Sequence, residues 1–299
     1  MSRTTRFWKL SGAGNDFIAL VEPAPEPAVL SAWCRRALSL GADGVLVLVR
    51  RNARVELEHY NADGTRSSLC LNGSRCAARL AFALGWAEDA FTLWTDAGPL
   101  ACRDLGTERA RVELPAGLAT APRRMRLPLD PSEQGPAVDG WFLQVGVPHF
   151  VVEHESLADL KITDTGPALR AHPALGAAGA NVDFVRFVDR ETLRLRTYER
   201  GVEAETLACG TGVVAAAVVG LLTERVDSAL TAETAGGFAL DLEFDLPELD
   251  SSDTAEHRAA LDRPIRCSGD ARLVATGELL AGAASVPRRP GWMPSGSGV

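Results

Sequence analysis

Alternation of apolar and polar residues is the most regular pattern along this chain. Short segments with period-two alternation and many β-branched side chains occur in both halves, at residues 45–49, 54–59, 111–114, 181–188, 193–197 and 238–244. Such segments predict β-strands. Because turn signals separate them at short spacing, we expect sheets that are antiparallel in large part, with few helices. The predicted fold class is therefore α+β.

Two longer apolar segments, residues 74–84 and 211–222, predict helices. The second is apolar on every side, so strands must enclose it. The first has the same character, softened by Arg75 and Arg79, and Gly85 is well placed to end it. A third helix is predicted at residues 27–38.

The two halves of the chain carry matching motifs in the same order. The first half has Gly14-Asn15-Asp16-Phe17, Gly41-Ala42-Asp43-Gly44, Tyr60-Asn61-Ala62-Asp63-Gly64 and Cys70-Leu71-Asn72-Gly73. The second half has Gly146-Val147-Pro148-His149-Phe150, Gly179-Ala180-Asn181-Val182, Tyr198-Glu199-Arg200-Gly201 and Cys209-Gly210-Thr211-Gly212. Matched anchors keep similar separations, 133 residues from Phe17 to Phe150 and 139 from Cys70 to Cys209. We therefore expect two related lobes about a pseudo-twofold axis, with both cysteines facing one cleft.

The motifs divide the chain into an N-terminal lobe at residues 1–121, with the first cysteine, and a C-terminal lobe at residues 122–277, with the second. Residues 116–140, rich in Pro, Gly and Arg, form the predicted crossing between the lobes. Residues 246–266 have no counterpart in the first half and are interpreted as an inserted loop. Residues 285–299 have little apolar content, which predicts a disordered tail.

Composition and charge narrow the kind of partner. The chain has 299 residues, of which 46% are hydrophobic, enough for two domains with real cores. A net charge of −8 without a Lys/Arg cluster argues against a nucleic-acid surface and an anionic membrane surface. The longest apolar run, residues 212–222, is shorter than the roughly 18 residues of a membrane span. We expect a small-molecule partner and, from the lack of a leader pattern, a cytoplasmic protein.

Six cysteines are scattered without a C-x-x-C pair, which disfavours a zinc ribbon, a thioredoxin-like dithiol and a secreted disulfide framework. Four of them are interpreted as small buried hydrophobic residues: Cys34, Cys76, Cys102 and Cys267. Cys70 and Cys209 instead precede glycine-containing turns that open the two apolar helices. Free N–H groups and the helix dipole there should lower the thiol pKa from about 8.5 and favour a bound carboxylate.

Two such thiols suit the inversion of a carbon stereocentre. Removing an α-proton from one face and returning a proton to the other requires two acid/base groups, one charged and one protonated. Helix N-termini aimed at the α-carboxylate would stabilise the charge that develops on it. The chain has no G-x-G-x-x-G after a strand, no Walker A motif and no H-E-x-x-H motif, so we expect neither cofactor nor metal. The thiols would carry protons rather than act as nucleophiles.

Residues 7–282 resemble the diaminopimelate epimerase family. The resemblance is carried by Gly14-Asn15-Asp16-Phe17 and by the segments 61–76 and 199–212 that contain the two cysteines. It implies cofactor-independent epimerisation of LL-2,6-diaminopimelate to meso-diaminopimelate, in lysine and peptidoglycan-precursor synthesis. It also implies a homodimer and two lobes, each a curled sheet around a central helix. Residues 278–284 would return to the N-terminal lobe.

Motif by motif, the resemblance implies that Cys70 and Cys209 are the catalytic acid and base. Positions that match the substrate contacts of the family are Asn15, Asn61, Asn72, Gly73, Ser74, Asn181, Glu199, Arg200, Gly210 and Thr211. At the far end of the substrate, Arg200 can grip the carboxylate bidentately, and Glu199 with the asparagine carbonyls can accept from the ammonium. His149 matches the histidine of the family's Gly-Asn-Pro-His motif, where either assistance to a thiol or a structural role fits.

Three departures from the family pattern bear on substrate fit. Val147 stands where the family usually has an asparagine, and the missing hydrogen bond is worth roughly 1–3 kcal/mol. Leu71 stands where glycine is frequent, and one extra residue lies between Arg200 and Cys209. Two alternatives stay open: a racemase or epimerase of another amino acid, and a binding protein whose paired thiols act as a redox switch.

Overall fold

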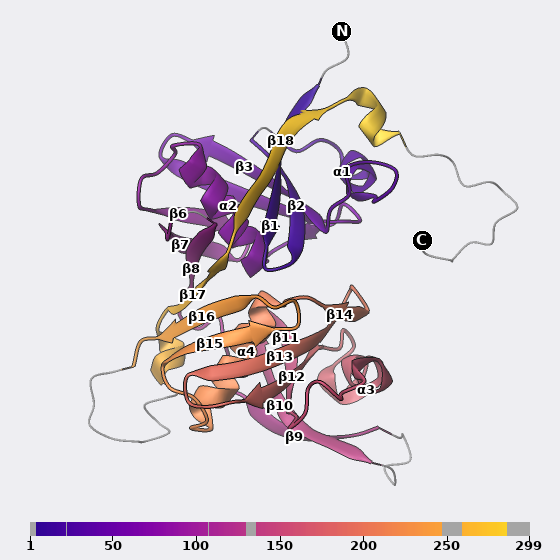
Figure 1. Ribbon diagram of the computed structural model, residues 1–299, viewed down its shortest axis with the longest axis vertical. Coiled ribbons are helices and arrows are strands. Elements are labelled where there is room, and N and C mark those ends of the chain that lie inside the picture. Colours follow the sequence, from indigo (N-terminus) through magenta and orange to yellow (C-terminus); the bar gives the residue numbers. More distant parts are fainter. Residues whose placement is uncertain (1–3, 22, 107, 130–135, 247–258, 286–299) are drawn as a thin grey trace, which may run out of the picture.

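The computed structural model describes residues 4–21, 23–106, 108–129, 136–246 and 259–285. Two lobes lie one above the other along the long axis of the molecule (Figure 1). Each lobe curls its sheet around one central helix, α2 (Leu71–Ala83) in the first and α4 (Gly210–Leu222) in the second. A shorter helix accompanies each sheet, α1 (Pro27–Cys34) and α3 (Ile162–Arg170). The predicted α+β class with two similar lobes is confirmed.

The strands of the two lobes follow one plan. The first lobe contains β1 (Thr5–Gly12), β2 (Asn15–Leu20), β3 (Gly44–Arg51), β4 (Arg54–Asn61), β5 (Arg66–Ser67), β6 (Ala90–Thr95), β7 (Gly98–Asp104) and β8 (Arg109–Leu114). The second contains β10 (Ala137–Val145), β11 (Val147–Glu153), β12 (Asn181–Phe187), β13 (Thr192–Glu199), β14 (Ala204–Thr206), β15 (Ala229–Thr234), β16 (Ala239–Phe244) and β17 (Ile265–Asp270).

The pairing of these strands repeats in order and in sense. The first lobe pairs β1–β2, β2–β3, β3–β4, β4–β5, β4–β6, β6–β7 and β7–β8. The second pairs β10–β11, β11–β12, β12–β13, β13–β14, β13–β15, β15–β16 and β16–β17. The second and fifth pairs of each series are parallel and the others antiparallel. The repeat predicted from the motifs is therefore a repeat of topology.

The two lobes also exchange strands. β9 (Arg123–Pro128) leaves the first lobe and pairs with β10, and β18 (Arg272–Leu279) leaves the second lobe and pairs with β1. β18 runs along the whole first lobe in Figure 1. β8 and β17 pair with each other, which joins the two sheets through backbone hydrogen bonds.

The chain returns to the first lobe earlier than predicted. β18 pairs with β1 from Arg272 onward, so residues 272–277 lie with the first lobe, because the free edge of β1 takes a partner strand. The boundary predicted at residue 122 falls between β8 and β9 and stays a prediction. In the predicted loop 246–266, residues 265–266 open β17. Residues 247–258, and the predicted tail beyond residue 285, lie outside the described residues.

The helix ends also differ from the prediction. α2 begins at Leu71 rather than residue 74, and α4 begins at Gly210 rather than residue 211. α1 ends at Cys34, four residues early, where the backbone turns extended at Arg35. Helix α3 was not predicted, since it is short and contains Pro167. Gly85 does end α2 as predicted, with a φ of +68° that glycine adopts at little cost.

The core explains why the two central helices meet. Residues 210–221 of α4 are all buried, as its uniformly apolar sequence predicts. One continuous cluster of buried apolar side chains spans both lobes, and α2 contacts α4.

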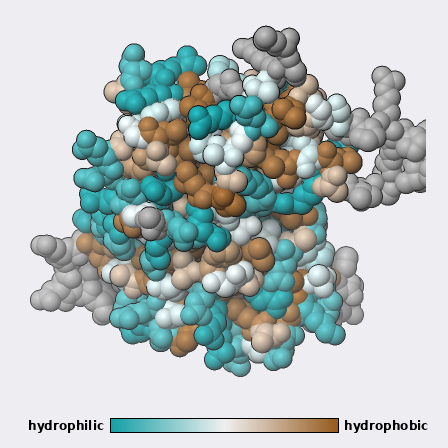
Figure 2. Space-filling view, turned by 45° about the horizontal axis from the view of Figure 1, so that its top comes forward, coloured by the Kyte–Doolittle hydropathy of each residue, from teal (hydrophilic) through white to brown (hydrophobic). Residues whose placement is uncertain are grey.

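On the face in Figure 2, polar and apolar residues are intermixed. Within the described residues, no helix is both long and apolar enough to cross a membrane.

Candidate active site

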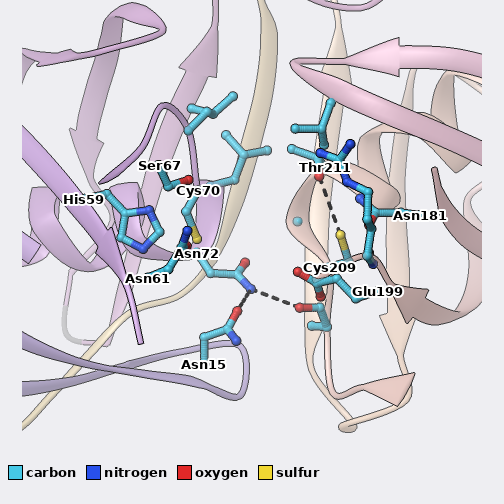
Figure 3. A pocket seen from close by; sticks show the side chains of 16 residues that line it. Asn15, His59, Asn61, Ser67, Cys70, Asn72, Asn181, Glu199, Cys209 and Thr211 are labelled. Atoms are coloured by element: carbon cyan, nitrogen blue, oxygen red, sulfur yellow. Dashed lines mark hydrogen bonds between the residues drawn. The ribbon is translucent and has the colours of Figure 1, made fainter. Parts of the chain in front are cut away.

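A cavity of about 230 Å³ lies between the two lobes, at the first turns of α2 and α4. Side chains of both lobes point into it (Figure 3). Its lining residues are Asn15, His59, Asn61, Ser67, Leu69, Cys70, Leu71, Asn72, Val147, Asn181, Glu199, Arg200, Ala208, Cys209, Gly210 and Thr211. The two cysteines singled out by the repeat thus reach one space.

Ten of the predicted site residues line this cavity: Cys70, Cys209, Asn15, Asn61, Asn72, Asn181, Glu199, Arg200, Gly210 and Thr211. Gly73 and Ser74 lie in the first turn of α2 and are buried. His149 does not line the cavity. It is fully buried, and its ring nitrogens face Asp183 and Asn181.

Each cysteine is itself the N-cap of its helix. Cys70 caps α2, and its Sγ accepts a hydrogen bond from the Gly73 N–H at 3.4 Å. Cys209 caps α4, and its Sγ lies 3.5 Å from Thr211 Oγ1. The turn predicted between each cysteine and its helix is wrong, because the helix begins at the next residue. Each sulfur therefore lies close to the free N–H groups of a first helical turn.

The protonation of the thiols differs from the prediction. Burial raises the pKa of Cys70 to about 11, although Arg75 and nearby backbone N–H groups act in the opposite direction. Burial and then the Glu199 carboxylate raise the pKa of Cys209 well above its usual range. The predicted lowering of the thiol pKa is wrong because removal from water outweighs the helix N-terminus. Both cysteines are neutral thiols near pH 7.

Asn72 connects the two lobes at the cavity wall. Its Nδ2 donates to Asn15 Oδ1 at 2.7 Å and to the Ala208 carbonyl of the other lobe at 3.1 Å. Its Oδ1 accepts from the guanidinium of Arg75 at 2.5 Å. Arg75 is itself fully buried. These bonds leave the amide of Asn72 one orientation and tie the first turn of α2 to the segment before α4.

A carboxylate and a cation follow one another on the opposite wall. Burial raises the pKa of the Glu199 carboxyl. The charge of Glu199 acts on both thiols and raises the pKa of each. Arg200, the next residue, lines the same cavity. The site therefore offers a carboxylate, a guanidinium, two thiols and several carboxamides, which is the set of groups that an amino acid substrate needs.

Comparison with known proteins identifies the family. The family model described as diaminopimelate epimerase matches residues 141–245. A diaminopimelate epimerase of Gemmatimonas aurantiaca is 36% identical over 288 residues, which cover 91% of this chain and 98% of the relative. One of Aquifex aeolicus is 34% identical over 262 residues, covering 81% and 92%. The chain belongs to the diaminopimelate epimerase family.

Solved structures of more distant proteins share the fold. A probable proline racemase from Agrobacterium radiobacter K84 superimposes with a TM-score of 0.67 at 14% identity, covering 97% of this chain and 98% of that one. A predicted epimerase from Pseudomonas aeruginosa has a TM-score of 0.67 at 16% identity, covering 93% and 99%. At these identities the likeness concerns the two-lobed architecture alone.

Within the diaminopimelate epimerase family, the departure at Val147 lies on the cavity itself. Val147 opens β11 at its pairing with Val145. An apolar side chain thus forms this part of the cavity wall. Leu71 also lines the cavity and is buried at the start of α2.

Four lining residues were not predicted: His59, Ser67, Leu69 and Ala208. His59 could have been found, since it lies two residues before Asn61 in β4 and alternate residues of a strand face the same side. Burial lowers the pKa of His59 to about 4, so its imidazole is neutral near pH 7. No motif or periodicity marked the other three.

Proposed function

We propose that this protein epimerises LL-2,6-diaminopimelate to the meso isomer, with Cys70 and Cys209 as the paired acid and base. The observation that carries the proposal is that two N-cap cysteines, one from each lobe, line a single cavity. Inversion needs proton carriers on opposite faces of the α-carbon. Membership of the diaminopimelate epimerase family supports this substrate and this reaction.

In this proposal the reacting end of the substrate lies between the two helix N-termini. Backbone N–H groups at residues 72–73 and 210–211 bind its α-carboxylate, as free amides at a helix start bind anions. When the α-proton leaves, negative charge spreads onto that carboxylate. The two helix dipoles then stabilise the carbanion more than they stabilise the bound substrate, which is the condition for lowering the barrier.

Substrate binding would also change the charge of the thiols. Before binding, burial and the Glu199 carboxylate hold both cysteines neutral. A substrate ammonium that pairs with Glu199 cancels that negative charge, so the pKa of each thiol falls. Release of one thiol proton to solvent as the substrate enters leaves one thiolate and one thiol. The thiolate takes the α-proton, and the opposite thiol gives a proton to the carbanion, so charge is conserved.

The far end of diaminopimelate is a second amino acid group. We assign its carboxylate to Arg200, which can bind bidentately, and its ammonium to the carboxamide oxygen of Asn61. Asn181 lies on the same wall of the cavity as Arg200. Two predictions from the sequence join this proposal, a homodimeric assembly and a cytoplasmic place in lysine and peptidoglycan-precursor synthesis.

Proton NMR of the reduced protein with LL-diaminopimelate in deuterated water tests the proposal. We expect loss of the α-proton signal together with appearance of the meso isomer. Cys70→Ala and Cys209→Ala should each abolish inversion. Cys102→Ala, which removes a buried thiol of β7 outside the cavity, should preserve it. Inversion by either cavity variant would overturn the two-base assignment.

Val147 favours a second candidate, a racemase or epimerase of another amino acid on the same scaffold. An apolar wall in place of a carboxamide would suit a substrate with a less polar far end. The same NMR experiment with a set of other amino acids separates the candidates. Faster inversion of any of them than of LL-diaminopimelate would favour the second.

A further inference from the structure

We infer that Asp183 and His149 are positioning residues that hold the side chain of Asn181 so that it presents an N–H donor to the cavity. The inference rests on the proposed function for the identity of the substrate. It deepens that proposal by assigning hydrogen-bond donors to one wall of the cavity. It also gives His149 a role through Asn181 rather than through a thiol.

A buried chain of hydrogen bonds links three neighbouring strands. The Thr197 hydroxyl of β13 donates to Asp183 Oδ1 of β12 at 2.7 Å. Asp183 Oδ2 lies 2.7 Å from His149 Nδ1 of β11. His149 Nε2 lies 3.5 Å from Asn181 Nδ2. All four residues are buried, and His149 and Asp183 have no exposed surface.

The backbone N–H of Arg200 sets the direction of this chain. It can only donate, and it lies 2.8 Å from Asn181 Oδ1. The amide nitrogen of Asn181 therefore faces His149, whose Nε2 must accept. The ring proton of His149 is then on Nδ1, which donates to Asp183 Oδ2. One backbone donor thus determines both the tautomer of the histidine and the orientation of the asparagine.

The consequence for the cavity is a fixed donor. Asn181 Nδ2 carries two hydrogens, of which His149 takes one, and the side chain lines the cavity. A half-turn of the amide would place its nitrogen against the Arg200 N–H and lose the hydrogen bond there. The wall beside the Arg200 guanidinium therefore offers N–H groups, which suit a carboxylate and disfavour an ammonium.

The first turn of α4 makes room for Asp183. A Cβ at Gly212 would lie 2.3 Å from Asp183 Oδ1, so a larger residue would displace the carboxylate. The carboxylate therefore rests directly against the first turn of α4. With Oδ1 held there and by the Thr197 hydroxyl, Oδ2 stays toward His149 Nδ1 and can accept its proton.

Nitrogen-15 NMR of the histidine-labelled protein tests the tautomer without substrate. The chain has five histidines, and His149→Gln identifies the signal. We expect a protonated Nδ1 and an unprotonated Nε2 at neutral pH. Asp183→Ala should give a mixture of tautomers, whereas Asp183→Asn, whose carbonyl can still accept from Nδ1, should restore the original form. A protonated Nε2 in the unsubstituted protein would overturn the inference.

A double-mutant cycle tests whether Asp183 acts through Asn181. Asp183→Ala should raise KM for diaminopimelate by about tenfold to a hundredfold, the loss of a hydrogen bond to a charged group, with a smaller change in kcat. In an Asn181→Ala background the same substitution should change KM little. Equal fold-changes in both backgrounds would overturn the inference.

Thr197→Val is the matched control, because it removes a hydrogen bond to Asp183 without touching His149. It should leave the proton of His149 on Nδ1. A changed tautomer would contradict the proposed order of hydrogen bonds from Asp183 to Asn181. If the protein shows the expected tautomer but does not turn over diaminopimelate, the proposed substrate fails while the hydrogen-bond assignment stands.

Discussion

Asn15 and Asn181 lie on the same cavity, one from each lobe, and are held by different means. Asn15 donates to Asp43, whose carboxylate pairs with Arg36 at the surface. Asn181 is held by His149, which Asp183 backs from the interior. The first arrangement is an ion-pair network at the protein surface. The second is a series of hydrogen bonds buried within a sheet.

The two arrangements differ in their access to water. The Arg36 side chain is 61% exposed, whereas His149 and Asp183 are not exposed at all. Exposed ion pairs are typically worth about 0–1 kcal/mol, but leaving a buried polar group without its hydrogen-bond partner costs about 1–3 kcal/mol. The site should therefore tolerate change far better on its N-terminal wall than on its C-terminal wall.

The largest expected effect is a loss of kcat that is similar for both lobes. Cys70→Ser and Cys209→Ser should each lower kcat by about 10²–10⁴-fold, the usual contribution of a positioned acid or base. The reason is that inversion uses both proton carriers in one turnover. Initial rates of meso-isomer formation by NMR measure it, and near-normal turnover by one variant would contradict the symmetry of the roles.

Stability should reveal the contrast directly. Asp183→Ala should lower the free energy of unfolding by about 3 kcal/mol, since it leaves the buried His149 and Thr197 without their acceptor. Asp43→Ala, its counterpart on the other wall, should cost about 1 kcal/mol. Urea unfolding of the two variants measures both values. Equal losses would mean that burial does not distinguish the two walls.

Acid should weaken the N-terminal network. Burial acts to raise the pKa of Asp16, but hydrogen bonds from Arg36 and Lys9 outweigh it and lower the pKa to about 2. Because this folded-state pKa lies below the usual 3.8, the pairing stabilises the fold fully above pH 4 and is lost as pH falls toward 2. Urea unfolding between about pH 2 and pH 5 measures this loss.

Arg36→Gln sharpens that measurement. It should flatten the pH dependence of the unfolding free energy below pH 4, because it removes one of the two cationic side chains that donate to Asp16. Arg190→Gln is the control, since Arg190 makes an exposed pair with Asp227 in the second lobe. An unchanged slope in Arg36→Gln would mean that Lys9 alone holds the carboxylate.

The smallest expected effect is an improvement, a lower KM for diaminopimelate. Val147→Asn should lower KM for diaminopimelate by up to about tenfold, the worth of one added neutral hydrogen bond. Steady-state kinetics measure this change in KM. Val145→Asn cannot serve as the control, because Val145 is fully buried. A raised KM for diaminopimelate would indicate that the apolar wall is matched to a different substrate.

Local pattern predicted the two central helices and several strands, but not helix α3 or the pairing partners of the strands. The apolar run at 211–222 predicts an enclosed helix because no face of it can meet water. Alternation predicts β-strands wherever one face is buried. It cannot say that residues 272–277 pair with β1, because that choice depends on which sheet edge is free after both lobes have formed.

Some features of the site could likewise be predicted from the sequence and others could not. The matched motifs were sufficient to bring Cys70 and Cys209 to one cavity, since their spacing repeats. The pKa of the thiols could not be predicted, because a helix start indicates nearby N–H groups and says nothing of burial. The role inferred for His149 was equally hidden, since it depends on Asp183 and on a backbone N–H from the next strand.

The strand exchange makes neither repeat complete by itself. The first repeat ends in β9, which lies on β10, and the edge of β1 is filled by β18 from the second repeat. Expressed alone, residues 1–128 would keep an open edge at β1 and an unattached strand at β9. Two copies could satisfy each other by laying β9 of one on β1 of the other. The present chain is in that sense a domain-swapped dimer whose two subunits have been joined into one.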